Sequence, residues 1–122
     1  MSEEVDEIVL QTIAMESANQ PMLGQAYVAK TIQTRARMGN ISPQEAVLKP
    51  KQYSAWNSPK TASAWLDKHY TPKARQNAWK AYTMAYSIPP VTHYHTLKVR
   101  PYWAKAMRHV ITVGGHSFYK EG

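Results

Sequence analysis

The sequence predicts an α+β fold that is mainly helical, with a small antiparallel β-sheet in the C-terminal half. Apolar residues recur at helical spacing through most of the chain before the proline pair at positions 89–90. Beyond it lie β-prone runs, and those at residues 110–113 and 116–119 are separated by two glycines that can take the positive φ of a hairpin turn. A length of 122 residues fits one domain, which we expect to span residues 1–122.

Helices are expected in five places before the sheet. The first is capped by Ser2 and ends just past Glu16, because residue 21 is a proline. The third begins with a capping box at residues 42–45, and Thr71 caps the fifth. We expect the aromatic residues of the last two helices to lie in the core. The expected ranges after the first helix are 23–38, closed by the Gly-Asn pair at 39–40, then a short helix from 43 to before Pro50, then 61–68 and 72–86.

Glu16 occupies the apolar side of the first expected helix. It shares one face with Val5, Val9 and Thr12, which precede it at helical intervals. A carboxylate that points inward loses hydration, which raises its pKa and lets it hold a proton near neutral pH. Glu16 is therefore a candidate general acid, although a carboxylate bonded to the backbone of the following turn would show the same pattern.

Residues 51–59 form a loop with neither helical nor strand periodicity. Polar groups alternate there with aromatic rings, which suits a sugar or a base because rings stack while amides bond hydroxyls or base edges. The alternative, which the pattern leaves equally open, is a loop pinned by Trp56 in the core. The candidate binding residues of this loop are Gln52, Tyr53, Ser54 and Trp56.

The expected strand at residues 91–97 alternates in character. His93 and His95 share one face, and Tyr94 lies on the other. Pro101 then opens a short helical turn that carries Trp103.

The charge distribution is uneven. The net charge is +7, but residues 1–20 hold five of the eight acids and no Lys or Arg. The rest of the chain is strongly basic and should attract polyanions, whether nucleic acid, anionic membrane or anionic cell-wall polymer. A nucleic-acid-binding domain is one alternative, in which Tyr53, Trp56, Tyr94 and Trp103 would stack on bases. No apolar run approaches the ~18 residues of a membrane span, so no membrane insertion is expected.

A zinc site is the other alternative. His93, His95 and His116 could supply the three imidazoles of a catalytic zinc, as in a zinc-dependent amidase. No carboxylate lies close to them in sequence to act as ligand or base, and the chain has no cysteine. We therefore expect no metal and no cofactor.

Glycoside cleavage agrees better with these residues. It usually takes two carboxylates, yet beyond Glu16 only Glu45, Asp67 and Glu121 remain, and none has a suggestive setting. A single acid suffices when a hydroxyl of the sugar itself attacks the oxocarbenium-like centre. Glu16 would protonate the leaving oxygen and then accept the proton of that hydroxyl.

Six short runs, taken together, resemble a known family. In order, they are similar to the EARGEP, GQVAVA and QFS motifs, the aromatic-rich strand, the closing Trp and the GHTFY motif of SleB-type cell-wall hydrolases, the spore-cortex-lytic enzyme family. The resemblance covers roughly residues 8–119, and the ordered set is more specific than any one run. The runs in this chain are ESANQP at 16–21, GQAYVA at 24–29, QYS at 52–54, THYH at 92–95, YWA at 102–104 and GHSFY at 115–119.

The resemblance implies a lysozyme-like fold and cleavage of peptidoglycan glycan strands by lytic transglycosylation or a related muramidase reaction. The family's first glutamate maps to Glu16 as the catalytic acid and base. Its second glutamate is Gln20 here, so the whole enzymatic prediction depends on Glu16. With the loop residues above, the resemblance extends the expected substrate contacts to His93, Tyr94, His95, Trp103, His116 and Tyr119.

The resemblance also implies a setting. The spore enzymes carry a signal peptide and a separate peptidoglycan-binding domain, and this chain shows neither. We therefore expect a bacteriophage version, an endolysin or virion-associated enzyme made in the host cytoplasm and acting on the bacterial cell wall. The expected partner is peptidoglycan rather than nucleic acid, and the expected state is a monomer.

Overall fold

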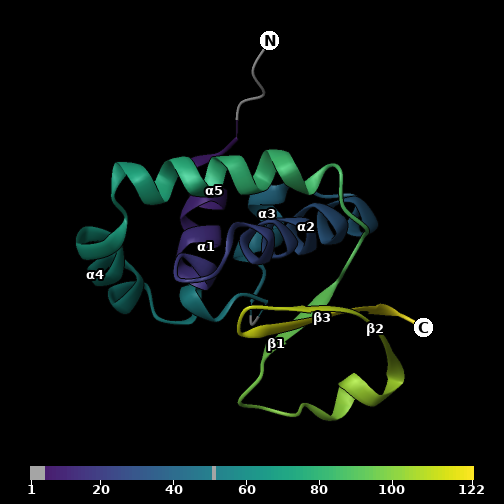
Figure 1. Cartoon of the computed structure of the whole chain (residues 1–122). Helices are drawn as coiled ribbons and strands as arrows, with labels where there is room; N and C mark the ends of the chain where they lie inside the picture. Colours follow the sequence, from purple (N-terminus) through teal and green to yellow (C-terminus); the bar gives the residue numbers. More distant parts are fainter. Residues whose placement is uncertain (1–4, 51) are drawn as a thin grey trace.

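Helices form the first two thirds of the chain and a small sheet the remainder, which confirms the predicted α+β class. The computed structural model describes residues 5–50 and 52–122. Within these residues the helices are α1 (Glu7–Ser17), α2 (Met22–Gly39), α3 (Pro43–Leu48), α4 (Pro59–His69) and α5 (Pro72–Ala85), with 3₁₀ turns η1 (Ser54–Asn57) and η2 (Tyr102–Ala106) (Figure 1). The strands are β1 (His93–Thr96), β2 (Met107–Val113) and β3 (His116–Glu121).

Most predicted helix ends are confirmed. Ser42 and Glu45 form the expected capping box, in which the Ser42 hydroxyl accepts from the Glu45 N–H at 3.1 Å and the Glu45 carboxylate accepts from the Ser42 N–H at 3.2 Å. The Thr71 hydroxyl caps α5 by accepting from the Ala74 N–H at 3.1 Å. Asn40 closes α2 in the left-handed region, with φ 54°.

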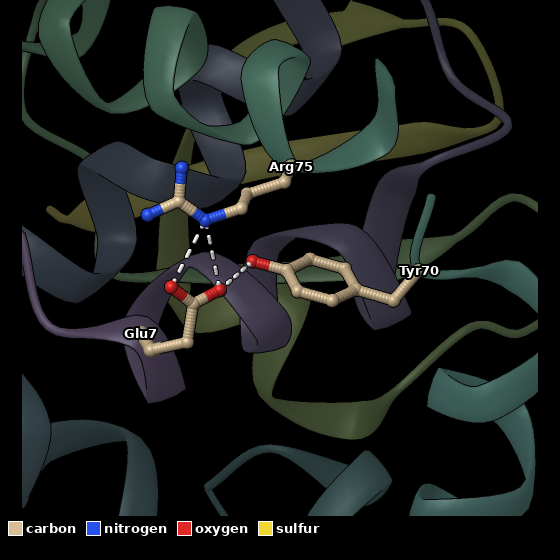
Figure 2. A network of polar contacts seen from close by, with 3 residues as sticks. All are labelled: Glu7, Tyr70 and Arg75. Atoms are coloured by element: carbon tan, nitrogen blue, oxygen red, sulfur yellow. Dashed lines mark hydrogen bonds and ion pairs between the residues drawn. The ribbon is translucent and has the colours of Figure 1, made fainter. Parts of the chain in front are cut away.

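The start of α1 differs from the prediction. Ser2, the expected cap, lies outside the described residues, and α1 begins at Glu7 after Asp6, whose side chain makes no capping bond. Contacts farther along the chain hold this end of α1 instead. The Tyr70 hydroxyl donates to the Glu7 carboxylate, and Arg75 Nε donates to both of its oxygens at 2.9 and 3.1 Å (Figure 2). The acid thus joins α1 to the junction of α4 and α5.

The helical core forms where α5 lies along α2 and over α1 (Figure 1). The predicted inner face of α2 is confirmed, since Val28, Ala29, Ile32 and Ala36 are all buried. The aromatic residues of α5 differ in burial. Tyr82 is buried, but Trp79 is 39% exposed, which contradicts its expected place in the core. None of the helices in the described part of the chain is long and apolar enough to span a bilayer.

The sheet is antiparallel with strand order β1-β3-β2. The predicted hairpin is confirmed as β2 and β3, and Gly114 takes φ +57° in its turn. The first strand is shorter than the expected 91–97, because β1 covers only His93–Thr96. One face of the sheet packs on α2, where Phe118 lies 5.3 Å from the Tyr27 ring, centroid to centroid. We call this the inner face.

Candidate active site

Glu16 lies where three parts of the chain meet. It sits in the last turn of α1 and is half-buried. The Tyr94 hydroxyl, from β1, donates to Glu16 Oε1, and the backbone of Ala55 in η1 also hydrogen-bonds the carboxylate. The prediction that Glu16 points inward at the end of a helix is thus confirmed by its place in the fold.

The surroundings of Glu16 favour its protonated form. Burial raises the pKa of Glu16, and this effect outweighs the Tyr94 bond, the Ala55 bond and the positive charge of Arg35, which lower it. Burial and the nearby Glu16 carboxylate also raise the pKa of Tyr94 well above its usual value. Tyr94 therefore stays a hydrogen-bond donor at neutral pH, and Glu16 can give up and regain a proton.

A small pocket of about 220 Å³ opens beside the carboxylate. Hydroxyl groups and one indole ring surround the acid, a combination that suits a sugar, whose hydroxyls bond polar groups while its ring stacks on an aromatic face. Thr61 and Trp65 come from α4, and neither was predicted as a site residue. Trp65 was expected in the core, but it is only half-buried and lines this pocket. The pocket is lined by Met15, Glu16, Ser54, Ala55, Ser58, Thr61, Ala62 and Trp65.

Arg35 is a further residue near Glu16 that the sequence did not predict. Its Nε donates to the Thr92 carbonyl at 2.7 Å, and its guanidinium carbon lies 5.2 Å from the centre of the Tyr53 ring. From there its charge lowers the pKa of Glu16 and opposes the rise in the pKa of Tyr94. Nothing in the sequence distinguishes Arg35 from the other basic residues, because its role depends on a contact across 57 positions.

The four loop residues expected to bind substrate do not lie together in the structure. Tyr53 is only 1% exposed and its hydroxyl lies 2.9 Å from that of Thr31, so its ring is not available to a sugar. Trp56 packs against the core and its Nε1 donates to Thr12 Oγ1 at 2.8 Å, which is the pinned-loop alternative. Gln52 is exposed and lines a different hollow. Ser54 does line the Glu16 pocket.

The aromatic and histidine residues of the sheet divide between its two faces. Tyr94 and His116 are on the inner face, where their rings lie 5.2 Å apart, and His116 is buried. His93, His95 and Tyr119 are on the other face, which we call the outer face, and Trp103 of η2 packs on all three at 5.1 to 5.8 Å. The expected contacts therefore do not line one groove.

This division also disfavours the zinc alternative. Residues on opposite faces of a sheet point away from each other, so His116 of β3 is not placed to join His93 and His95 of β1 around one ion. The part of the chain that the structure describes contains no group of three His, Cys, Asp or Glu residues placed to hold a metal.

Gln20, which stands where the resembling family has its second glutamate, makes a structural contact. Its Oε1 accepts from the Gly115 N–H at 2.7 Å, and so joins the loop after α1 to the β2–β3 turn. A Cβ at Gly114 would lie 2.3 Å from this oxygen, so the turn needs glycine there both for space and for its positive φ.

The sequence profile described as Cell Wall Hydrolase matches residues 19–119. The chain belongs to the cell wall hydrolase family. It is therefore an enzyme of cell-wall degradation, as its resemblance to the SleB-type enzymes implied. The profile match begins three residues after Glu16, so the role of this acid depends on the geometry above.

Solved structures place the cell wall hydrolase in the same fold as SleB. The catalytic domain of the germination-specific lytic transglycosylase SleB from Bacillus anthracis is 21% identical, with a TM-score of 0.68 over 98% of this chain and 100% of that one. The SleB catalytic domain from Bacillus cereus has the same identity and TM-score, over 98% and 95%. No curated protein sequence matches the chain significantly.

Proposed function

We propose that this cell wall hydrolase cuts the glycan strands of peptidoglycan by lytic transglycosylation, with Glu16 as acid and then base. The protonated carboxyl gives its proton to the glycosidic oxygen as the bond from that oxygen to C1 of the muramyl sugar breaks. The O6 hydroxyl of the same sugar then bonds to C1 and returns its proton to the carboxylate. No water is consumed, and the new end is a 1,6-anhydro sugar.

The setting of Glu16 carries this proposal. A half-buried carboxyl with a raised pKa lines a pocket of hydroxyls and an indole ring. Among the described residues, the other side-chain carboxylates lie elsewhere: Asp6 precedes α1, Glu7 is paired with Arg75, Glu45 is committed to the capping box of α3, Asp67 is exposed on α4, and Glu121 lines another hollow. Without a second acid in the pocket to activate water, attack by the sugar's own hydroxyl is favoured over hydrolysis. The name lytic transglycosylase given to the SleB domain of the same fold agrees with this choice.

The substrate contacts are proposed from the same pocket. Ser54, Ser58 and Thr61 would bond sugar hydroxyls, and Trp65 would stack on a ring. The outer-face residues His93, His95, Trp103 and Tyr119 lie across the sheet from Tyr94, and we assign them no part in bond cleavage. The nucleic-acid alternative is not favoured, because Tyr53 is buried, Trp56 is pinned and Tyr94 is committed to Glu16.

The test compares the wild type with Glu16→Gln on purified sacculi. The substitution keeps the shape of the side chain and removes the titrating proton, so the rate should fall about 10²–10⁴-fold or more. Asp67→Asn, which removes an exposed carboxylate from α4, is the matched control and should keep full activity. Circular dichroism reports whether each variant is folded, and a folded Glu16→Gln variant with most of its activity would contradict the assignment.

The products are the second readout. Mass spectrometry separates 1,6-anhydro ends from reducing ends by one water. Mainly anhydro ends support transglycosylation, whereas mainly hydrated ends would mean that a second base activates water.

The phage setting and the monomeric state remain parts of this proposal. An endolysin should lyse cells when it is produced together with a membrane-permeabilising holin and not when it is produced alone. Size-exclusion chromatography with light scattering tests the monomer.

A further inference from the structure

The segment that joins β1 to β2 exposes large apolar side chains. Leu97 is 55% exposed, Val99 50% and Tyr102 90%. In Figure 1 this yellow-green segment projects from the sheet on the side away from the helices. An apolar group of this kind, gathered within six positions, is typical of an interaction site rather than of ordinary surface.

The same segment is strongly cationic. Lys98, Arg100 and Lys105 alternate with the exposed apolar residues, and residues 68–120 contain no Asp or Glu. Among the described residues, the one ion pair between side chains is that of Arg75 with Glu7, at the other end of the molecule. Among the described residues, Lys98, Arg100 and Lys105 therefore form no ion pair with a side-chain carboxylate.

A hollow of about 650 Å³ lies under these side chains. Arg100 and Lys105 line it together with Tyr102, and His95 and Tyr119 contribute from the outer face of the sheet. The His95 Nε2 and the Tyr119 hydroxyl lie 2.9 Å apart and so form a polar, hydrogen-bonded wall. The hollow thus combines positive charge with polar and apolar walls.

We propose that residues 97–105 dock this domain on the surface of an anionic phospholipid bilayer. Cations near such a surface pair with phosphate groups, while apolar side chains enter the boundary between headgroups and acyl chains and a tyrosine ring lies at headgroup level. A soluble polyanion would engage Lys98, Arg100 and Lys105 but would leave Leu97 and Val99 in water. The exposed apolar residues therefore decide between the two partners in favour of the membrane. Docking is peripheral and involves no spanning segment.

Docking at this segment leaves the Glu16 pocket open. The pocket is built from α1, η1 and α4, whereas the segment adjoins the outer face of the sheet. The enzyme could thus rest on a lipid surface while its pocket faces the wall polymer. The inference does not depend on the reaction assigned to Glu16.

Sedimentation with vesicles tests the docking surface. The full chain is mixed with vesicles of phosphatidylglycerol and phosphatidylcholine, and separately with vesicles of phosphatidylcholine alone. We expect binding to the anionic vesicles only. Replacement of Lys98, Arg100 and Lys105 by Gln should weaken it by about 100-fold, because each cation contributes about one factor of five near a charged bilayer.

A variant that lacks the exposed apolar side chains provides the decisive test. Leu97→Ser, Val99→Ser and Tyr102→Ser together keep every charge and should weaken vesicle binding by at least about tenfold. The matched control replaces Lys68, Lys73 and Lys80 of α4 and α5 by Gln, which removes the same charge elsewhere and should keep most of the binding. Activity on sacculi, which contain no lipid, checks that all variants are folded. The proposal is overturned if the apolar variant binds vesicles as tightly as the wild type. It is also overturned if the control variant of Lys68, Lys73 and Lys80 loses as much vesicle binding as the variant of Lys98, Arg100 and Lys105.

Single-stranded DNA provides the polyanion comparison. If the apolar variant and the wild type bind it equally well and neither binds vesicles, the segment is a charge-only surface and the membrane proposal fails. If DNA binding is weak and salt-sensitive while vesicle binding depends on Leu97, Val99 and Tyr102, the proposal is supported.

Discussion

The two faces of the small sheet use the same kinds of residue for different purposes. On the inner face, the Tyr94 hydroxyl donates to Glu16 and its ring packs against His116 and Phe118. On the outer face, the Tyr119 hydroxyl lies 2.9 Å from His95 and its ring stacks on the same histidine. Tyr94 belongs to the candidate site because α1, which faces it, supplies the Glu16 carboxylate. On the outer face, no carboxylate of the described residues hydrogen-bonds the Tyr119 hydroxyl, which contacts His95 instead.

Burial separates the faces as well. Phe118 is fully buried between the sheet and α2, and burial lowers the pKa of the neighbouring His116. Trp103 is half-buried over the outer-face rings and is carried by a short 3₁₀ turn. The inner face thus belongs to the core of the domain, whereas the outer-face cluster packs outside this core.

The largest expected difference between the faces is in stability. Phe118→Ala should cost about 3–5 kcal/mol in the free energy of unfolding, because it leaves a cavity in the core. Trp103→Ala should cost less than half of that, since its ring is already partly in water. Urea unfolding followed by circular dichroism measures both. Equal losses would mean that the outer cluster is a second core.

A smaller difference is expected in catalysis. Tyr94→Phe removes one hydrogen bond to a charged carboxylate, and the rate should fall about 10–100-fold. Because that bond lowers the pKa of Glu16, its loss should raise this pKa further and move the alkaline limb of the pH–rate profile to higher pH. Tyr119→Phe, which removes the matching hydroxyl from the outer face, should leave both the rate and the profile unchanged. Equal effects of the two variants would contradict the division between faces.

The pH dependence of stability tests whether Glu16 on the inner face is destabilised by burial. Burial raises the folded-state pKa of Glu16 above its unfolded value, so its contribution to stability is present below the unfolded pKa and is lost as pH rises through the folded pKa. Glu16→Gln should therefore match the wild type in melting temperature at acidic pH and exceed it at neutral and alkaline pH. Thermal unfolding across that range checks the trend. A difference that stays constant with pH would show that the carboxyl is not destabilised by burial.

The smallest expected effect is that of a chelator. Because His116 lies on the face opposite His93 and His95, EDTA should leave glycan cleavage intact. Assays on sacculi before and after dialysis against EDTA measure this. A loss that zinc restores would favour an amidase over the proposed reaction.

Local signals in the sequence predicted much of the fold. The capping box at Ser42, the cap at Thr71 and the glycine pair of the hairpin are short-range patterns, and the structure contains all three. The inward direction of Glu16 followed from helical periodicity alone. Each of these features depends on residues only a few positions apart, which is the range over which propensity and spacing act.

The environment of Glu16 could not be predicted in the same way. Tyr94, which hydrogen-bonds Glu16, is 78 positions away in the chain. Arg35 is held by a hydrogen bond to the carbonyl of Thr92, which is 57 positions away. Tyr53 looked like a binding residue because it lies in a polar loop, yet the bond to Thr31 places it in the core. Such contacts depend on which elements meet in space. The sequence pattern around each residue does not indicate which elements those are.

The end of α1 is joined to the sheet at two points, Glu16 with Tyr94 and Gln20 with Gly115. These contacts bridge 78 and 95 positions of the chain, so neither can form before the strands have been synthesised. During synthesis, α1 emerges before the strands, with a carboxylate that water still hydrates. The pKa of Glu16 rises only when folding buries the carboxyl, and contacts of such long range form slowly. We therefore expect a chain in which Glu16 is not yet buried to have the carboxylate but not the raised pKa that a general acid needs.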